Sequence, residues 1–84
     1  MNQNIYAIKD TMVGFMTPYC QPNDGYAKRA FSNAATDLKP NQINQNPEDK
    51  ELYFIGEFDE ETGIITPANP KYLARASEFV KRGE

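Results

Sequence analysis

The residues with the most evident chemical potential are the carboxylates of ELYFIGEFDEETGIITP, residues 51–67. Asp59, Glu60 and Glu61 are adjacent, and adjacent carboxylates on a loop can gather Ca²⁺. A calcium loop takes its ligands from alternating positions and closes with a bidentate acid, and DEETG has neither feature. Its residue types are instead those of a short hairpin turn, with Gly63 free to adopt a positive φ. We therefore expect a solvated turn here and no metal site.

The residues that most enzymes use for acid–base and nucleophilic chemistry are nearly absent. The chain contains no histidine, so the commonest general base near neutral pH is missing. The one cysteine, Cys20, has no basic neighbour in sequence to activate its thiol, and its lack of a partner cysteine fits a reducing compartment. The glycines are scattered, so no phosphate-binding loop is present, and zinc ligands are too few. We expect a protein that binds without catalysis and without a cofactor.

Basic and aromatic side chains are the remaining candidates for a site. Rings that project from a sheet can stack on unpaired bases, at about 1–3 kcal/mol per base, and cations beside them can contact phosphates. The alternatives are that each ring is buried in the core or in a dimer interface, and that each cation lies on a solvated helix face. The candidate nucleic-acid-binding residues are Lys9, Lys28, Arg29, Arg75, Tyr6, Tyr19 and Tyr53.

Two hairpins and a helix would position most of these residues. Strand-forming residues on either side of a turn at Asp10-Thr11 predict a hairpin over 4–16. A second hairpin is predicted over 51–66, around the DEETG turn. Between the hairpins, apolar residues recur at helical spacing, which predicts a helix over 24–38 that Asn23 or Asp24 caps.

The remaining segments are a polar loop over 39–50 and a tail with helical spacing. The tail begins with Asn69 as a potential cap and Pro70 at the first helical position, which predicts a C-terminal helix over 70–82. The fold class expected from this order is α+β. It would be a four-stranded, mainly antiparallel sheet of two hairpins, with the main helix packed on one face and the C-terminal helix beside it.

Length and charge limit the possible partners. The 84 residues predict a single domain with a marginal core, so a homo-oligomer is expected. No apolar run approaches the roughly 18–20 residues that span a bilayer, and the segment MNQNIYAIKD lacks the pattern of a signal peptide. The net charge of −3 argues against a protein that coats nucleic acid by electrostatics alone.

Several segments resemble one family, the small nonstructural protein of gokushoviruses, which are single-stranded DNA phages of the microvirus group. The resemblance is carried by PEDKELYFIGEFDEETGIITP (47–67), in which Pro-Glu-Asp leads into a strand ending Gly-Glu-Phe-Asp before a Thr-Gly turn. It extends over roughly residues 4 to 75. The other matching residues are Lys9-Asp10, Thr17-Pro18, Pro22-Asn23, Ala27, Arg29, Phe31 and Asp37.

The resemblance implies a phage protein made in the host bacterial cytoplasm. Members of this family are described as DNA-binding proteins that act in the synthesis of the viral single strand. Its motifs are structural, and Arg29 is the best single match for a DNA contact.

Two hypotheses follow. In the first, the chain binds single-stranded DNA, with its basic residues on one face and Asp59–Glu61 directed away from the DNA. In the second, it is a protein-interaction module whose acidic and aromatic surface engages a viral replication protein, a scaffolding protein or a host protein. Composition favours the second hypothesis, and the resemblance favours the first.

Overall fold

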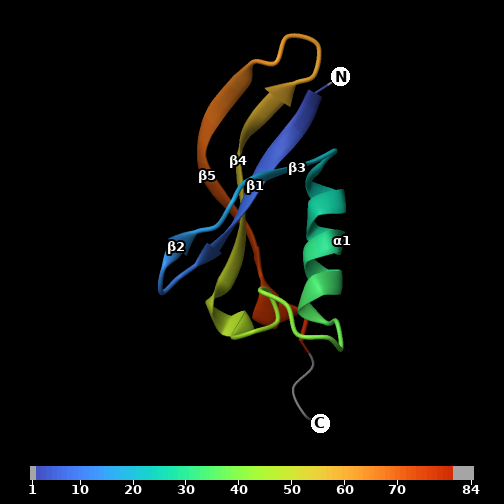
Figure 1. The fold of residues 1–84 in the computed structure, drawn as a ribbon, viewed down its shortest axis with the longest axis vertical. Helices are drawn as coiled ribbons and strands as arrows, with labels where there is room; N and C mark the ends of the chain where they lie inside the picture. The colour runs from blue at the N-terminus through green and yellow to red at the C-terminus, as the bar shows by residue number, and fades with distance from the viewer. Residues whose placement is uncertain (1, 81–84) are drawn as a thin grey trace.

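The computed structural model describes residues 2–80, and these form one antiparallel sheet and one α-helix (Figure 1). The elements in chain order are β1 (Asn2–Asp10), β2 (Gly14–Phe15), β3 (Tyr19–Gln21), α1 (Asp24–Ala35), the 3-10 turn η1 (Pro47–Asp49), β4 (Lys50–Asp59), β5 (Ile65–Arg75) and the 3-10 turn η2 (Ala76–Glu78). The expected α+β class, the antiparallel sheet and the single main helix are confirmed.

The strand order across the sheet is β2-β1-β4-β5, and every pairing is antiparallel. The short strand β3, which the sequence pattern did not predict, also pairs with β1 and extends the same edge as β2. β1 is therefore a central strand. It pairs with β4 along one edge, and with β3 and then β2 along the other. The free edge at the opposite side is β5, which contains Pro67 and Pro70.

The hairpin expected over 51–66 is present, and its strands are longer than predicted. Gly63 has φ 76 in the turn, and its amide donates to the carbonyl of Asp59 at 2.8 Å, as a hairpin turn requires. The β1–β4 register shifts next to Gly56, where a Cβ atom would lie 2.7 Å from the Thr66 carbonyl oxygen. Glycine is needed there because β5 passes too closely for any side chain.

The helix α1 covers one face of the sheet (Figure 1). Asn23 caps it, as predicted, by accepting a hydrogen bond from the Tyr26 amide at 2.9 Å. The helix ends at Ala35, three residues before the predicted end, and Thr36 occupies the C-cap position. Its buried side chains meet the strands in a core whose members are Tyr6, Ile8, Ala27, Phe31, Ala35, Leu52, Ala74 and Ala76.

Tyr6 ties β1 to the start of the helix. Its ring is fully buried, and its hydroxyl donates to Asp24 at 2.6 Å and accepts from the Asn4 amide at 2.9 Å. Burial and the hydrogen bond to the Asp24 carboxylate raise the pKa of Tyr6 to about 12, from 10.0. The neutral phenol is therefore the form that the fold favours.

This raised pKa predicts a loss of stability at high pH. The contribution of Tyr6 is fully present below pH 10 and is lost as pH rises towards 12, because the unfolded chain releases this proton first. We expect Tyr6→Phe to flatten the fall of the urea midpoint between pH 10 and 12, and to cost about 1 kcal/mol at pH 7. Tyr26→Phe, at an exposed position, is the control. Parallel declines in the wild type and in Tyr6→Phe would contradict the assignment.

The prediction of a C-terminal helix over 70–82 is wrong. Residues 70–75 belong to β5, residues 76–78 form a 3-10 turn, and residues 81–82 lie outside the described part of the chain. The apolar residues of this segment still reach the core. Ala74 and Ala76 are buried, and the Phe79 ring meets the Phe31 ring edge-to-face with centroids 6.2 Å apart.

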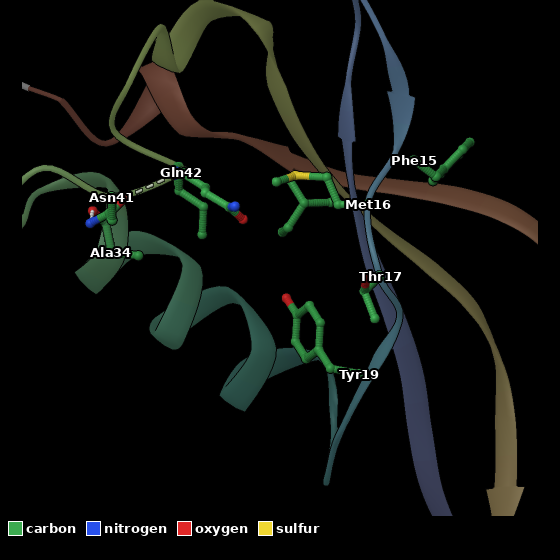
Figure 2. A pocket seen from close by; sticks show the side chains of 9 residues that line it. Phe15, Met16, Thr17, Tyr19, Ala34, Asn41 and Gln42 are labelled. Carbon is green, nitrogen blue, oxygen red and sulfur yellow. Dashed lines mark hydrogen bonds between the residues drawn. The ribbon is translucent and has the colours of Figure 1, made fainter.

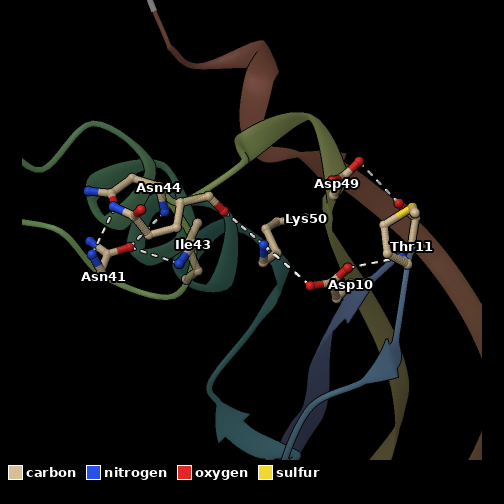
Figure 3. A network of polar contacts seen from close by, with 9 residues as sticks. Asp10, Thr11, Asn41, Ile43, Asn44, Asp49 and Lys50 are labelled. Carbon is tan, nitrogen blue, oxygen red and sulfur yellow. Dashed lines mark hydrogen bonds and ion pairs between the residues drawn. The ribbon is translucent and has the colours of Figure 1, made fainter.

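The polar loop expected over 39–50 is held by its own side chains (Figure 3). Asn41 accepts from the amides of Ile43 and Asn44 and donates to the Ala34 carbonyl, which attaches the loop to the end of α1. At the other end, the buried Lys50 donates to the Gln45 carbonyl at 2.8 Å and lies 3.4 Å from the Asp10 carboxylate. The loop is thus fastened to both the helix and the sheet.

Candidate nucleic-acid interface

We call the sheet face opposite α1 the helix-free face. The alternation of side chains along β1 shows which residues belong to it. Tyr6 and Ile8 point into the core beneath the helix. Successive strand residues point to opposite faces, so Ile5, Ala7 and Lys9 belong to the other face. No element among residues 2–80 covers this face as α1 covers the first (Figure 1).

Three aromatic rings cross this face from β2 through β4 to β5. We call Phe15, Tyr53 and Tyr72 the aromatic row. The Phe15 and Tyr53 rings meet edge-to-face with centroids 5.3 Å apart, and those of Tyr53 and Tyr72 do so at 5.9 Å. Phe15 is 49% exposed and Tyr72 is 46% exposed, so each end of the row presents ring surface to solvent. Such a row is suited to stacking against flat ligands.

The row is flanked by two cations and two carboxylates, one of which, Glu78, accepts from the Tyr72 hydroxyl at 2.8 Å. The Lys9 amine lies 5.6 Å from the centre of the Phe15 ring and 6.0 Å from that of Tyr53. Arg75 donates to the buried Glu51 carboxylate at 2.5 Å, and Tyr53 also donates to Glu51, at 3.1 Å. The hydrogen bond from Arg75 lowers the pKa of Glu51 despite its burial. Glu51 thus stays ionised and offsets part of the positive charge at this site.

The structure brings together three of the seven predicted site residues: Lys9, Tyr53 and Arg75. Tyr6 is in the core, and a ring with no exposed surface cannot stack on a base, so its predicted role is wrong. Tyr19 is half-buried on the helix side of the sheet, with its ring 6.3 Å from that of Tyr6.

Lys28 and Arg29 are exposed on α1, in the other layer of the molecule. A nucleic-acid strand that lies straight along the aromatic row therefore does not reach these two cations. The expected grouping of the helix cations with the sheet aromatics is therefore not what the fold provides.

Sequence reasoning missed Phe15 and Tyr72 as members of the site. Phe15 falls within a predicted strand, but the sequence does not show to which face of the sheet it points. Tyr72 was assigned to a helix, which would have carried it away from Tyr53. The signal that could have found it is the alternation Lys71-Tyr72-Leu73-Ala74-Arg75 as a strand opposite Glu51–Tyr53.

The acidic turn Asp59–Glu61 lies at the far end of β4 from Glu51 and its partners (Figure 1). The Asp59 carboxylate accepts from the Glu61 amide at 2.9 Å, which lowers the pKa of Asp59 and orders the turn. Within residues 2–80, no group of three or more potential ligands is placed to hold a metal ion.

The chain is thus a small α+β protein whose antiparallel sheet leaves one aromatic face uncovered. A family model described as Phage ORF5 protein matches residues 3–79. The chain belongs to this family of bacteriophage proteins. No curated protein and no solved structure matches it. No helix in the described part of the chain has the length and apolar character needed to cross a membrane.

Proposed function

We propose that this Phage ORF5 family protein binds single-stranded DNA on its helix-free face, without catalysis, in the host bacterial cytoplasm. The observation that carries the proposal is the aromatic row, with two rings about half exposed beside Lys9 and Arg75. The resemblance of the sequence to the gokushovirus proteins supports a role in the synthesis of the viral single strand.

Stacking, rather than charge, would supply most of the affinity. Each base stacked on an exposed ring contributes about 1–3 kcal/mol, and rings accept any base because all bases present a π-face. Duplex DNA keeps its bases stacked on one another, so the row would discriminate against it. The two cations beside the row are offset by the carboxylates of Glu51 and Glu78, which leaves Lys9 and Arg75 a positioning role towards one or two phosphates.

The direct test is fluorescence anisotropy of a labelled single-stranded oligonucleotide titrated with the protein, with the matching duplex as the control. Binding that prefers the single strand supports the proposal. An absence of binding at low salt and high protein concentration would reject it. Sedimentation of the same samples would report whether the chain is the expected homo-oligomer in its free and bound states.

The salt dependence of this binding should be shallow. A cation that neutralises one phosphate of a single strand contributes a slope of about −0.7 to log Kobs against log[salt], so Lys9 and Arg75 together give a slope no steeper than about −1.4. Lys9→Gln should reduce this slope by about 0.7. Lys28→Gln makes the same charge change on α1 and should leave the slope unchanged. A steep slope, or an equal effect of the two variants, would place the DNA elsewhere on the protein.

The second candidate is a protein-interaction module, and one observation favours it. A cavity of about 290 Å³ opens between Ile5, Pro18, Phe58 and Ile65, with a lining that is almost entirely apolar. Ile65 is 61% exposed at the end of the sheet that carries the acidic turn. An apolar anchor on a basic partner, such as a replication, scaffolding or host protein, would match this surface. Ile65→Ser should then abolish capture of the partner while leaving oligonucleotide binding intact.

A further inference from the structure

A separate cavity lies on the helix side of the sheet edge (Figure 2). It has a volume of about 690 Å³, opens to solvent, and is lined by the last turn of α1, the start of the polar loop and the segment that joins β2 to β3. This volume falls within the range of about 300–1,000 Å³ that is typical of small-molecule sites. Its walls are mainly apolar and include Ile8, Met16, Ala34 and Ile43.

Two polar groups converge on this apolar space. The Tyr19 hydroxyl, from a half-buried residue, and the Gln42 amide, from an exposed residue at the rim, both point into it (Figure 2). Among residues 2–80, neither group has a hydrogen-bond partner. Gln42 offers both a donor and an acceptor, and burial raises the pKa of Tyr19, which keeps its hydroxyl a neutral donor. Within residues 2–80 no charged side chain lines the cavity, so it suits an uncharged flat ring with polar groups on its edge.

The cavity adjoins the aromatic row at Phe15. Residue 15 lines the cavity, but its ring projects away from it and contacts Tyr53 on the helix-free face (Figure 2). The next residue, Met16, turns its side chain back towards the core. β2 has only two residues, so a bound DNA strand needs little length to pass around this edge of the sheet.

We propose that the cavity takes one unstacked nucleobase from the same DNA strand that crosses the aromatic row. The inference rests on the proposed function and adds a base-reading site to it. The row accepts any base by stacking, whereas Gln42 and Tyr19 would hydrogen-bond to the edge of the inserted base and so distinguish one base from another. The phosphates on either side of this base remain outside, in solvent.

The test uses the ¹⁵N-labelled protein and short homo-oligonucleotides of thymidine, cytidine and adenosine. We expect the side-chain amide signals of Gln42 to shift on binding, along with the backbone signals of Tyr53 and Tyr72. One homo-oligonucleotide should bind more tightly than the others, and Gln42→Ala should remove that preference.

Filling the cavity should weaken binding while leaving the row intact. Ala34→Leu places a larger side chain in the cavity and is expected to reduce affinity by about fivefold or more, the equivalent of one lost base. Ala30→Leu, at an exposed position of the same helix, is the matched control and should have no effect. Shifts at Tyr53 and Tyr72 without any at Gln42, or unchanged affinity in Ala34→Leu, would overturn the cavity site but leave the proposed function standing. No shift at any of these residues would overturn both.

Discussion

A variant with both Phe15→Ala and Tyr72→Ala is expected to bind a single-stranded oligonucleotide about 30-fold more weakly than the wild type, or weaker still. The magnitude follows from two lost stacking positions, each contributing at least about 1 kcal/mol. The two rings do not contact each other; each contacts Tyr53, so their effects should add to a first approximation. Tyr53 is kept in the variant because it holds a hydrogen bond to the buried Glu51.

The matched control is Tyr26→Ala, which removes an aromatic ring that is 60% exposed on α1. Anisotropy titrations of the three proteins, after circular dichroism has shown that each is folded, would give the comparison. Equal losses in the control and in the double variant would show that affinity depends on exposed aromatic surface in general. Affinity within about twofold of wild type in the double variant would exclude the aromatic row as the site.

Phe31→Ala is expected to cost about 3–5 kcal/mol of the free energy of unfolding. Phe31 is 1% exposed and joins the helix to both the sheet core and Phe79. At roughly 0.05–0.15 kcal/mol per residue, a chain of this length has about 4–13 kcal/mol of stability, so one ring accounts for much of it.

Urea unfolding would measure this cost, with Leu38→Ala as the control. Leu38 is fully exposed, so its truncation should change stability by less than about 0.5 kcal/mol. If Phe31→Ala does not fold, Phe31→Leu should still fold, with a loss of about 1.5 kcal/mol or less. If Phe31→Ala lowers the free energy of unfolding no more than Leu38→Ala does, the helix contributes little to the core.

The sequence contained enough to predict the class of fold and much of the hairpin and helix arrangement. Local signals were sufficient where they were strong: Asn23 at the start of α1, and Gly63 in the turn between β4 and β5. They failed at residues 70–75. There the helical spacing of Tyr72, Leu73 and Ala76 was outweighed by cross-strand contacts, because pairing with β4 places Tyr72 against Tyr53 and Arg75 against Glu51.

The candidate site was harder to predict than the fold, because it depends on which face of the sheet each strand residue occupies. Tyr6 and Lys9 lie three positions apart on β1, so alternation places them on opposite faces, one in the core and one beside the aromatic row. The helix cations could not be assigned to a face until the side of the sheet that α1 covers was known. Phe15 and Tyr72 joined Tyr53 only through pairings between distant segments.

The prolines of β5 have a consequence for the behaviour of the chain at high concentration. An exposed sheet edge with a complete row of amide donors is a template on which another chain can add a strand, and repeated addition leads to aggregation. β5, the strand at one edge, contains Pro67 and Pro70, which have no amide N–H to donate, and the other edge is divided between strands of two and three residues. Residues 2–80 therefore offer no long, uninterrupted edge along which copies of this protein could polymerise.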